Sequence, residues 1–114
     1  MNQKLEEAIA GLRCVNKPVK QIARTLGVKK DSIEKIIKDW IMDTDPYINE
    51  LIVERKVNNI PDANEMKLLV KMDTDDLLGD KRILDYIAKK RNDHHDRFMD
   101  CIRYKIKIML ENKK

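Results

Sequence analysis

The chain has 114 residues, and 39% of them are charged while 42% are hydrophobic. That length fits one domain, or a small motif domain with a helical extension. No apolar run reaches the roughly eighteen residues that a membrane helix needs, and the start lacks an apolar leader, so we expect a cytoplasmic protein that does not enter membranes. Few glycines, prolines and aromatic residues disfavour a β fold, and we expect an all-α one.

Several kinds of chemistry find no support in the residue spacing. Cys14 and Cys101 are far apart in the sequence, which is typical of neither a disulfide framework nor a CxxC metal site, so we expect reduced thiols. His94 and His95 are adjacent, and on a helix neighbouring side chains point about 100° apart, which disfavours a shared metal ion. The chain has no glycine-rich phosphate loop and no spacing typical of a nucleophile with its base. We therefore expect no enzyme, no cofactor and no small-molecule ligand.

Charge is distributed in three blocks along the chain. Residues 1–42 are net basic, 43–80 net acidic and 81–114 net basic again. A basic N-terminal unit is suited to nucleic acid, because neutralising phosphates releases counterions. The acidic and basic blocks that follow are expected to pair with each other, within one chain or between two, unless all three are simply solvated surfaces.

Apolar periodicity predicts helices at 3–13, 19–26, 30–41, 46–57, 63–70 and from 83 toward the C-terminus. Pro18 is expected in the first turn of the second helix, and Gly27 is expected to end it with a positive φ. A stop is predicted at 43–46, where Asp45 would cap a new helix that has Pro46 in its first turn. A turn region is predicted at 73–80.

Residues 19–38 combine two short amphipathic segments with small residues at fixed places, Ala23 where the two helices touch and Gly27 where the chain reverses. Ile33 follows at the third fixed place, and the apolar positions between these match as well. This segment resembles the helix-turn-helix of prokaryotic and phage DNA-binding proteins. The resemblance implies an N-terminal three-helix unit at 1–42, followed by a helical region at 43–114 for oligomerisation or partner binding.

The resemblance further implies that the helix from Lys30 to about Trp40 enters the major groove of double-stranded DNA. Its first exposed side chains would read base edges: Lys29, Lys30, Asp31, Ser32, Glu34 and Lys35. Others would contact phosphates: Lys20, Gln21, Arg24 and Lys38. Lys29 departs from the usual pattern, because it stands where Ser or Thr commonly caps the reading helix.

The C-terminal stripe of Phe98, Ile102, Ile106 and Met109 is expected either to pack within its own chain or to join two copies in a homodimer. The sequence thus predicts a bacterial or phage transcription regulator that binds a specific DNA site. One alternative is a short relative of phage terminase small subunits, whose helices assemble a ring. The other is a helix-turn-helix fold that binds a protein, which the acidic pair Asp31 and Glu34 favours.

Overall fold

The computed structural model describes residues 3–90 and 96–113, and within these ranges every regular element is a helix. The predicted all-α class is therefore confirmed. None of the described helices has the length and apolar composition that a membrane span requires. The helices are α1 (Gln3–Cys14), α2 (Val19–Leu26), α3 (Lys30–Leu51), α4 (Ala63–Leu69), α5 (Thr74–Gly79), α6 (Lys81–Lys90) and α7 (Arg97–Asn112).

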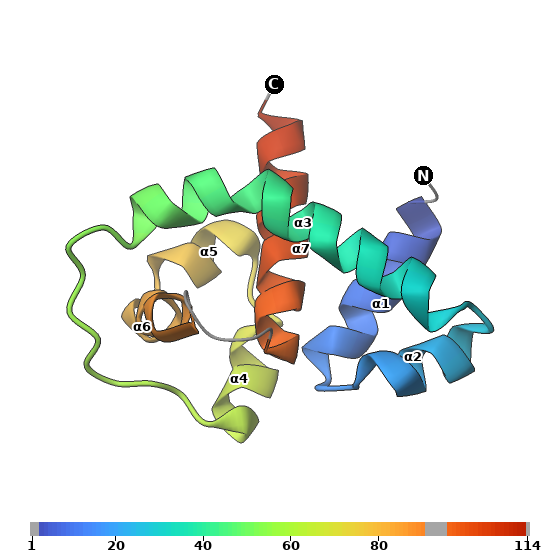
Figure 1. Cartoon of the computed structure of the whole chain (residues 1–114). Helices are drawn as coiled ribbons and strands as arrows, with labels where there is room; N and C mark the ends of the chain where they lie inside the picture. Colours follow the sequence, from blue (N-terminus) through green and yellow to red (C-terminus); the bar gives the residue numbers. More distant parts are fainter. Residues whose placement is uncertain (1–2, 91–95, 114) are drawn as a thin grey trace.

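The C-terminal helix α7 stands at the centre of the molecule. Figure 1 shows it crossing α3, with α1 and α2 on one side and α4, α5 and α6 on the other. It packs against both α1 and α3, so the last helix completes the unit that the first three begin. The final segment of the chain is therefore a structural part of the N-terminal unit.

The three N-terminal helices share one apolar cluster. Helical spacing puts Ile33, Ile37 and Trp40 on a single face of α3, and each of them is at most 3% exposed. Ile9 and Ala10 of α1 and Ile22 of α2 cover that face, with Tyr104 of α7 packed against the cluster. The stripes predicted for these three helices are confirmed.

A second cluster joins the end of α3 to the remaining helices. Its members come from α3, α4, α5, α6 and α7, and include Ile48, Met66, Leu77, Ile83, Ile87, Phe98, Ile102, Ile106 and Met109. The four residues of the C-terminal stripe are between 0% and 9% exposed within this single chain. The sequence left two roles open for these residues. In the structure they pack within their own chain, and the stripe offers no surface to a second copy.

The turn between α2 and α3 depends on Gly27. This residue caps α2 with φ 65°, and its amide donates to the carbonyl of Ala23, as the left-handed cap geometry requires. A β-carbon built at Gly27 would meet nothing within 4 Å, so the glycine is needed for its backbone angle and not for space. The predicted helix end and positive φ are confirmed.

Two glycine-to-alanine substitutions are expected to change stability in opposite directions. Gly27→Ala should lower the free energy of unfolding by about 1–2 kcal/mol, because alanine is strained at a left-handed φ. Gly11→Ala should raise it by about 0.5–1 kcal/mol, because Gly11 lies inside α1 with open space around its α-carbon. Urea denaturation of both variants measures the difference, and equal shifts would contradict the role given to Gly27.

The stop predicted at 43–46 was wrong, because α3 runs through Pro46 without interruption. Thr44 is fully buried, donates through Oγ1 to the carbonyl of Trp40 (2.7 Å) and accepts from Nη1 of Arg103 (3.0 Å). Trp40, Thr44 and Ile48 therefore continue one buried face at a spacing of four. This tertiary packing outweighs the backbone hydrogen bond that Pro46 cannot donate.

The domain boundary expected at residue 42 also needs correction, since it falls within α3. The first half of this helix belongs to the N-terminal cluster and the second half to the other cluster, and α7 contributes to both. The two cores are distinct, but the helices α3 and α7 that carry them are continuous. The two apolar clusters are therefore joined through α3 and α7 and are not separated by a linker.

The helix predicted at 46–57 was wrong beyond Leu51. The carboxylate of Asp85, 3% exposed, accepts from the backbone amides of Asn58 and Asn59 and from Nε of Arg55 (2.8 Å). These bonds, led by the one from Asn59, hold the pKa of Asp85 below its ordinary value. They fix residues 55–59 to α6 in an irregular loop.

The turn region predicted at 73–80 contains α5 instead. Two acidic residues, Asp75 and Asp76, lie in its first turn, where their negative charge stabilises the helix by interacting with the positive end of its dipole. Leu77 is fully buried in the second cluster and supplies the tertiary contact that so short a helix needs. The helices expected at 63–70 and from 83 are present as α4, α6 and α7, while residues 91–95 lie outside the described ranges.

Candidate functional site

The residues predicted to contact DNA lie together on α2, on the following turn and on the first half of α3. All ten are exposed. We call them the α2–α3 surface: Lys20, Gln21, Arg24, Lys29, Lys30, Asp31, Ser32, Glu34, Lys35 and Lys38. Six carry positive charge and two carry negative charge, so this surface is basic although the chain as a whole has a net charge of only +4.

The α2–α3 surface is held by the apolar cluster beneath it. On α3, Asp31, Lys35 and Lys38 recur at helical spacing on the side opposite to Ile33 and Ile37, which are buried. The core therefore fixes which side chains α3 presents outward. A rigid helix with its charged side outward is the geometry that a groove-binding element requires.

The N-terminus of α3 has no side-chain cap. Lys29 occupies the N-cap position in an extended conformation (φ −64°, ψ 140°) without a capping hydrogen bond, as the departure from the usual pattern predicted. Within the first turns, Nζ of Lys30 lies 3.6 Å from Oε1 of Glu34, and both side chains are more than half exposed. Such a pair contributes little to stability, so Lys30 remains available to a stronger anionic partner.

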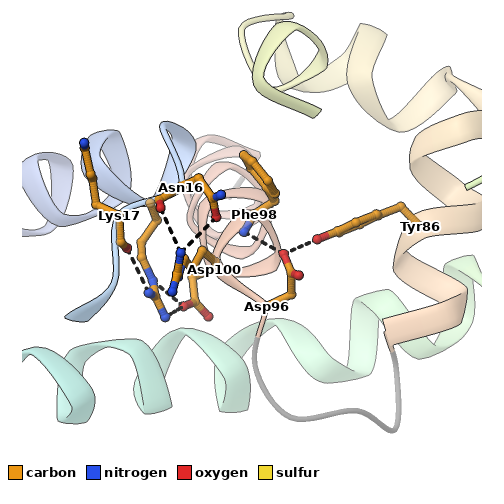
Figure 2. A network of polar contacts seen from close by, with 8 residues as sticks. Asn16, Lys17, Tyr86, Asp96, Phe98 and Asp100 are labelled. Atoms are coloured by element: carbon orange, nitrogen blue, oxygen red, sulfur yellow. Dashed lines mark hydrogen bonds and ion pairs between the residues drawn. The ribbon is translucent and has the colours of Figure 1, made fainter. Parts of the chain in front are cut away.

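The corner that leads from α1 into α2 is fastened to the start of α7. Figure 2 shows Asn16 and Lys17 beside Asp100, with Asp96 and Phe98 at the start of the same helix. Arg13 donates through Nε to Oδ2 of Asp100 (2.6 Å) and through Nη1 to the carbonyl of Lys17 (3.1 Å). Asn16 has a positive φ of 67°, and its carbonyl accepts from Nη1 of Arg97 at 3.1 Å. These contacts fix the approach of the chain to α2.

The same junction contains a covalent link that the sequence spacing did not predict. Cys14 and Cys101 form a disulfide, and their α-carbons are 5.3 Å apart, which is within the range of such bonds. The expectation of two reduced thiols is corrected for this structure. It failed because sequence distance does not report that α1 and α7 lie side by side.

Three charged residues of α7 recur at a spacing of three and four and pair with residues of α1 and α3. Asp100 pairs with Arg13, Nη1 of Arg103 lies 2.7 Å from Oδ1 of Asp45, and Nζ of Lys107 lies 2.9 Å from Oε1 of Glu6. We call this row the polar seam of α7. In this row, the Arg103 pair joins the acidic block 43–80 to the basic block 81–114, as the sequence predicted, and the other two pairs reach back to α1. Arg82 joins the same two blocks through Asp80 and Glu65.

Glu6 is a buried carboxylate with two donors. Nε1 of Trp40 donates to its Oε1 at 2.8 Å, and Lys107 donates to the same atom at 2.9 Å. Burial disfavours the charged form of Glu6, but these hydrogen bonds and the ammonium of Lys107 outweigh it and hold the pKa of Glu6 below its ordinary value. Glu6 therefore stays ionised and ties α1 to both α3 and α7.

The polar seam was missed because charged residues in amphipathic helices were interpreted as solvated surface. A signal was present: Glu6 and Arg13 share the side of α1 that carries Ile9, at spacings of three and four. A charge at a core position usually has a buried partner, so these two residues pointed to partners elsewhere. The identity of those partners depends on tertiary structure.

Comparison with protein-family models, with curated proteins and with solved structures finds no match for this chain. In the part of the chain that the structure describes, no three His, Cys, Asp or Glu side chains are grouped in a way that would hold a metal ion. His94 and His95 lie outside that part. Only the geometry of the surface and the sequence pattern therefore bear on function.

Proposed function

We propose that α2 and α3 form a helix-turn-helix that binds double-stranded DNA, with α3 as the reading helix. The observation that carries this proposal is the α2–α3 surface, in which all ten residues of the sequence pattern are exposed and six are cationic. Two further features support the proposal. Gly27 has a left-handed conformation in the short turn between α2 and α3, and the two helices share one apolar cluster. The cationic side chains supply the counterion release that dominates DNA affinity.

The residues divide between reading and positioning. In this proposal Lys30 and Lys35, on the first turns of α3, donate to guanine O6 and N7, while Asp31 and Glu34 accept from cytosine N4. Lys29 and Ser32 complete the base-reading set. Lys20, Gln21 and Arg24 on α2 contact phosphates in the same proposal, together with Lys38 further along α3. A cytoplasmic transcription regulator of bacterial or phage DNA is the role we favour.

A homodimer of this chain would need a surface other than the C-terminal stripe. Because the stripe at Phe98, Ile102, Ile106 and Met109 is buried within the chain, a homodimer would use other residues. A single chain is expected to contact one major-groove segment, and a dimer two segments one helical turn apart. Light scattering of the purified protein distinguishes these from a ring, and a ring would favour the DNA-packaging role of terminase small subunits.

Alanine substitutions on the α2–α3 surface are expected to fall into two classes. Lys30→Ala and Lys35→Ala should each weaken binding to a preferred site by about 1–3 kcal/mol and relax its sequence preference. Lys20→Ala should weaken binding to all duplexes alike and lower the dependence of log K on log salt by about 1. Fluorescence anisotropy with labelled duplexes at several salt concentrations measures both effects.

Lys56→Ala is the matched control for these variants. Lys56 is exposed and lies in the loop after α3, and its substitution removes the same charge. Figure 1 shows that this loop lies on the opposite side of the molecule from α2. Its affinity for DNA should equal that of the unmodified protein. If all four variants bind equally well, the α2–α3 surface does not contact DNA.

A protein partner is the second candidate, and one observation favours it. Met42 lies one turn after Lys38 on the same side of α3 and is 64% exposed. An exposed methionine next to charges of both signs is typical of a surface that binds another protein. This candidate predicts no salt-dependent binding to any duplex.

A further inference from the structure

The disulfide between Cys14 and Cys101 is accessible from one side. Cys101 is 1% exposed, whereas Cys14, at the end of α1, is only half-buried. A surface hollow of about 260 Å³ reaches both cysteines and is bordered by Glu7 and Gly11 of α1 and Lys105 of α7. A small molecule entering this hollow meets Cys14 before Cys101.

Gly11 borders the hollow beside Cys14. It lies one turn before Cys14 on the same side of α1, is exposed, and has nothing within 4 Å of the place of a β-carbon. Glycine inside a helix is less favourable than alanine. Because no packing contact and no positive φ require it, Gly11 is explained by neither sterics nor backbone geometry.

Two ion pairs join α1 and α7 in addition to the disulfide. Arg13 and Asp100, next to the two cysteines in the sequence, form a buried ion pair. Lys107 and Glu6 form a second pair between the same helices at 2.9 Å. The thiols of a reduced chain would therefore remain neighbours in a folded protein and could form the bond again. Reversible opening needs both this and access to one sulfur.

We propose that Cys14–Cys101 is a thiol–disulfide exchange site for low-molecular-mass thiols of the glutathione class. The thiolate attacks Sγ of Cys14, the bond between the cysteines breaks, and Cys101 leaves as a thiolate that takes a proton from water. A second thiolate then attacks the sulfur of the bound thiol. It releases the Cys14 thiolate and a symmetrical disulfide, so that two electrons pass from two small thiols to the protein.

The test uses the full native chain and reduced glutathione. The oxidised protein is incubated at neutral pH, samples are quenched with an alkylating reagent, and intact mass with peptide mapping gives the redox state of each cysteine. Circular dichroism of the same samples reports whether the helices persist. We expect the disulfide to open without loss of helix, through a mixed disulfide located on Cys14.

Gly11→Leu and Gly79→Leu form a matched pair for this measurement. Both glycines are exposed and have open space around them, but only Gly11 borders the hollow. Leucine at 11 should slow opening by about tenfold, because the exchange rate depends on access to the attacked sulfur. Leucine at 79 should leave the rate unchanged. Opening only when the helices unfold, a mixed disulfide on Cys101, or equal rates in the two variants would each overturn the proposal.

Discussion

Asp100→Ala is expected to lower the free energy of unfolding by about 3–5 kcal/mol, because it leaves the guanidinium of Arg13 buried without its carboxylate. The side chains of this ion pair are only 6% and 0% exposed for Arg13 and Asp100. Arg13 also holds the carbonyl of Lys17, so its displacement would loosen the corner before α2. Urea denaturation followed by circular dichroism, with the cysteines in one redox state throughout, measures the loss.

Two further variants isolate the cause of that loss. Arg13→Met combined with Asp100→Leu removes both charges, and it should recover most of the stability, because two apolar side chains of similar size need no buried partner. Lys30→Ala breaks the exposed pair with Glu34 and should cost no more than about 0.5 kcal/mol. Equal costs for Asp100→Ala and Lys30→Ala would show that burial of the Arg13 pair has no energetic consequence.

Trp40→Ala is expected to cost about 3–5 kcal/mol, because it leaves a cavity where α1, α3 and α7 meet. Trp40 is fully buried, its ring centroid lies 5.0 Å from that of Tyr104 on α7, and its Nε1 donates to Glu6 on α1. Trp40 is the largest fully buried side chain in the described ranges. Thermal and urea denaturation give the change in stability.

Trp40→Phe separates packing from hydrogen bonding at the same position. Phenylalanine keeps an aromatic ring against Tyr104 but cannot donate to Glu6, which retains its bond from Lys107. We expect a loss of about 1–3 kcal/mol from the smaller ring and the missing donor, which is less than for alanine. If alanine and phenylalanine cost the same, the hydrogen bond and not the packing holds the three helices together.

The sequence predicted the fold class and the helices whose stripes are purely apolar. Ile9 on α1, Ile22 on α2, and Ile33 and Ile37 on α3 recur at helical spacing and are all buried, so periodicity was sufficient there. The helix end at Gly27 was also predictable, because few residues other than glycine adopt the positive φ that ends α2. These features depend on neighbours within one or two turns of the chain.

The predictions failed where a polar residue is buried by a distant partner. Thr44 and Asp45 look like the start of a new helix, but in the folded chain both contact Arg103, which is 58 or 59 positions away. The helix predicted at 46–57 likewise ends at Leu51, and the residues that follow bind Asp85 through Arg55 and the amides of Asn58 and Asn59. Local propensity carries no information on such partners, because they are set by tertiary packing.

The candidate site was more predictable than the parts that support it. Exposed polar residues on α2 and α3 follow from the apolar pattern alone, and all ten residues are exposed, as that pattern predicted. Neither the disulfide nor the polar seam of α7 could be derived in this way. The role of the C-terminal stripe stayed open in the sequence, because an apolar face does not reveal whether it packs within a chain or between two.

The most direct test of DNA reading by α3 is the selection of fragmented genomic DNA by the purified full chain at physiological salt, where non-specific binding is weak. We predict enrichment of one short site, and loss of that enrichment in Lys30→Ala and Lys35→Ala but not in Lys56→Ala. Recovery of no preferred sequence, with the helices intact and no salt-dependent binding to any duplex, would contradict the proposal that the α2–α3 surface reads DNA.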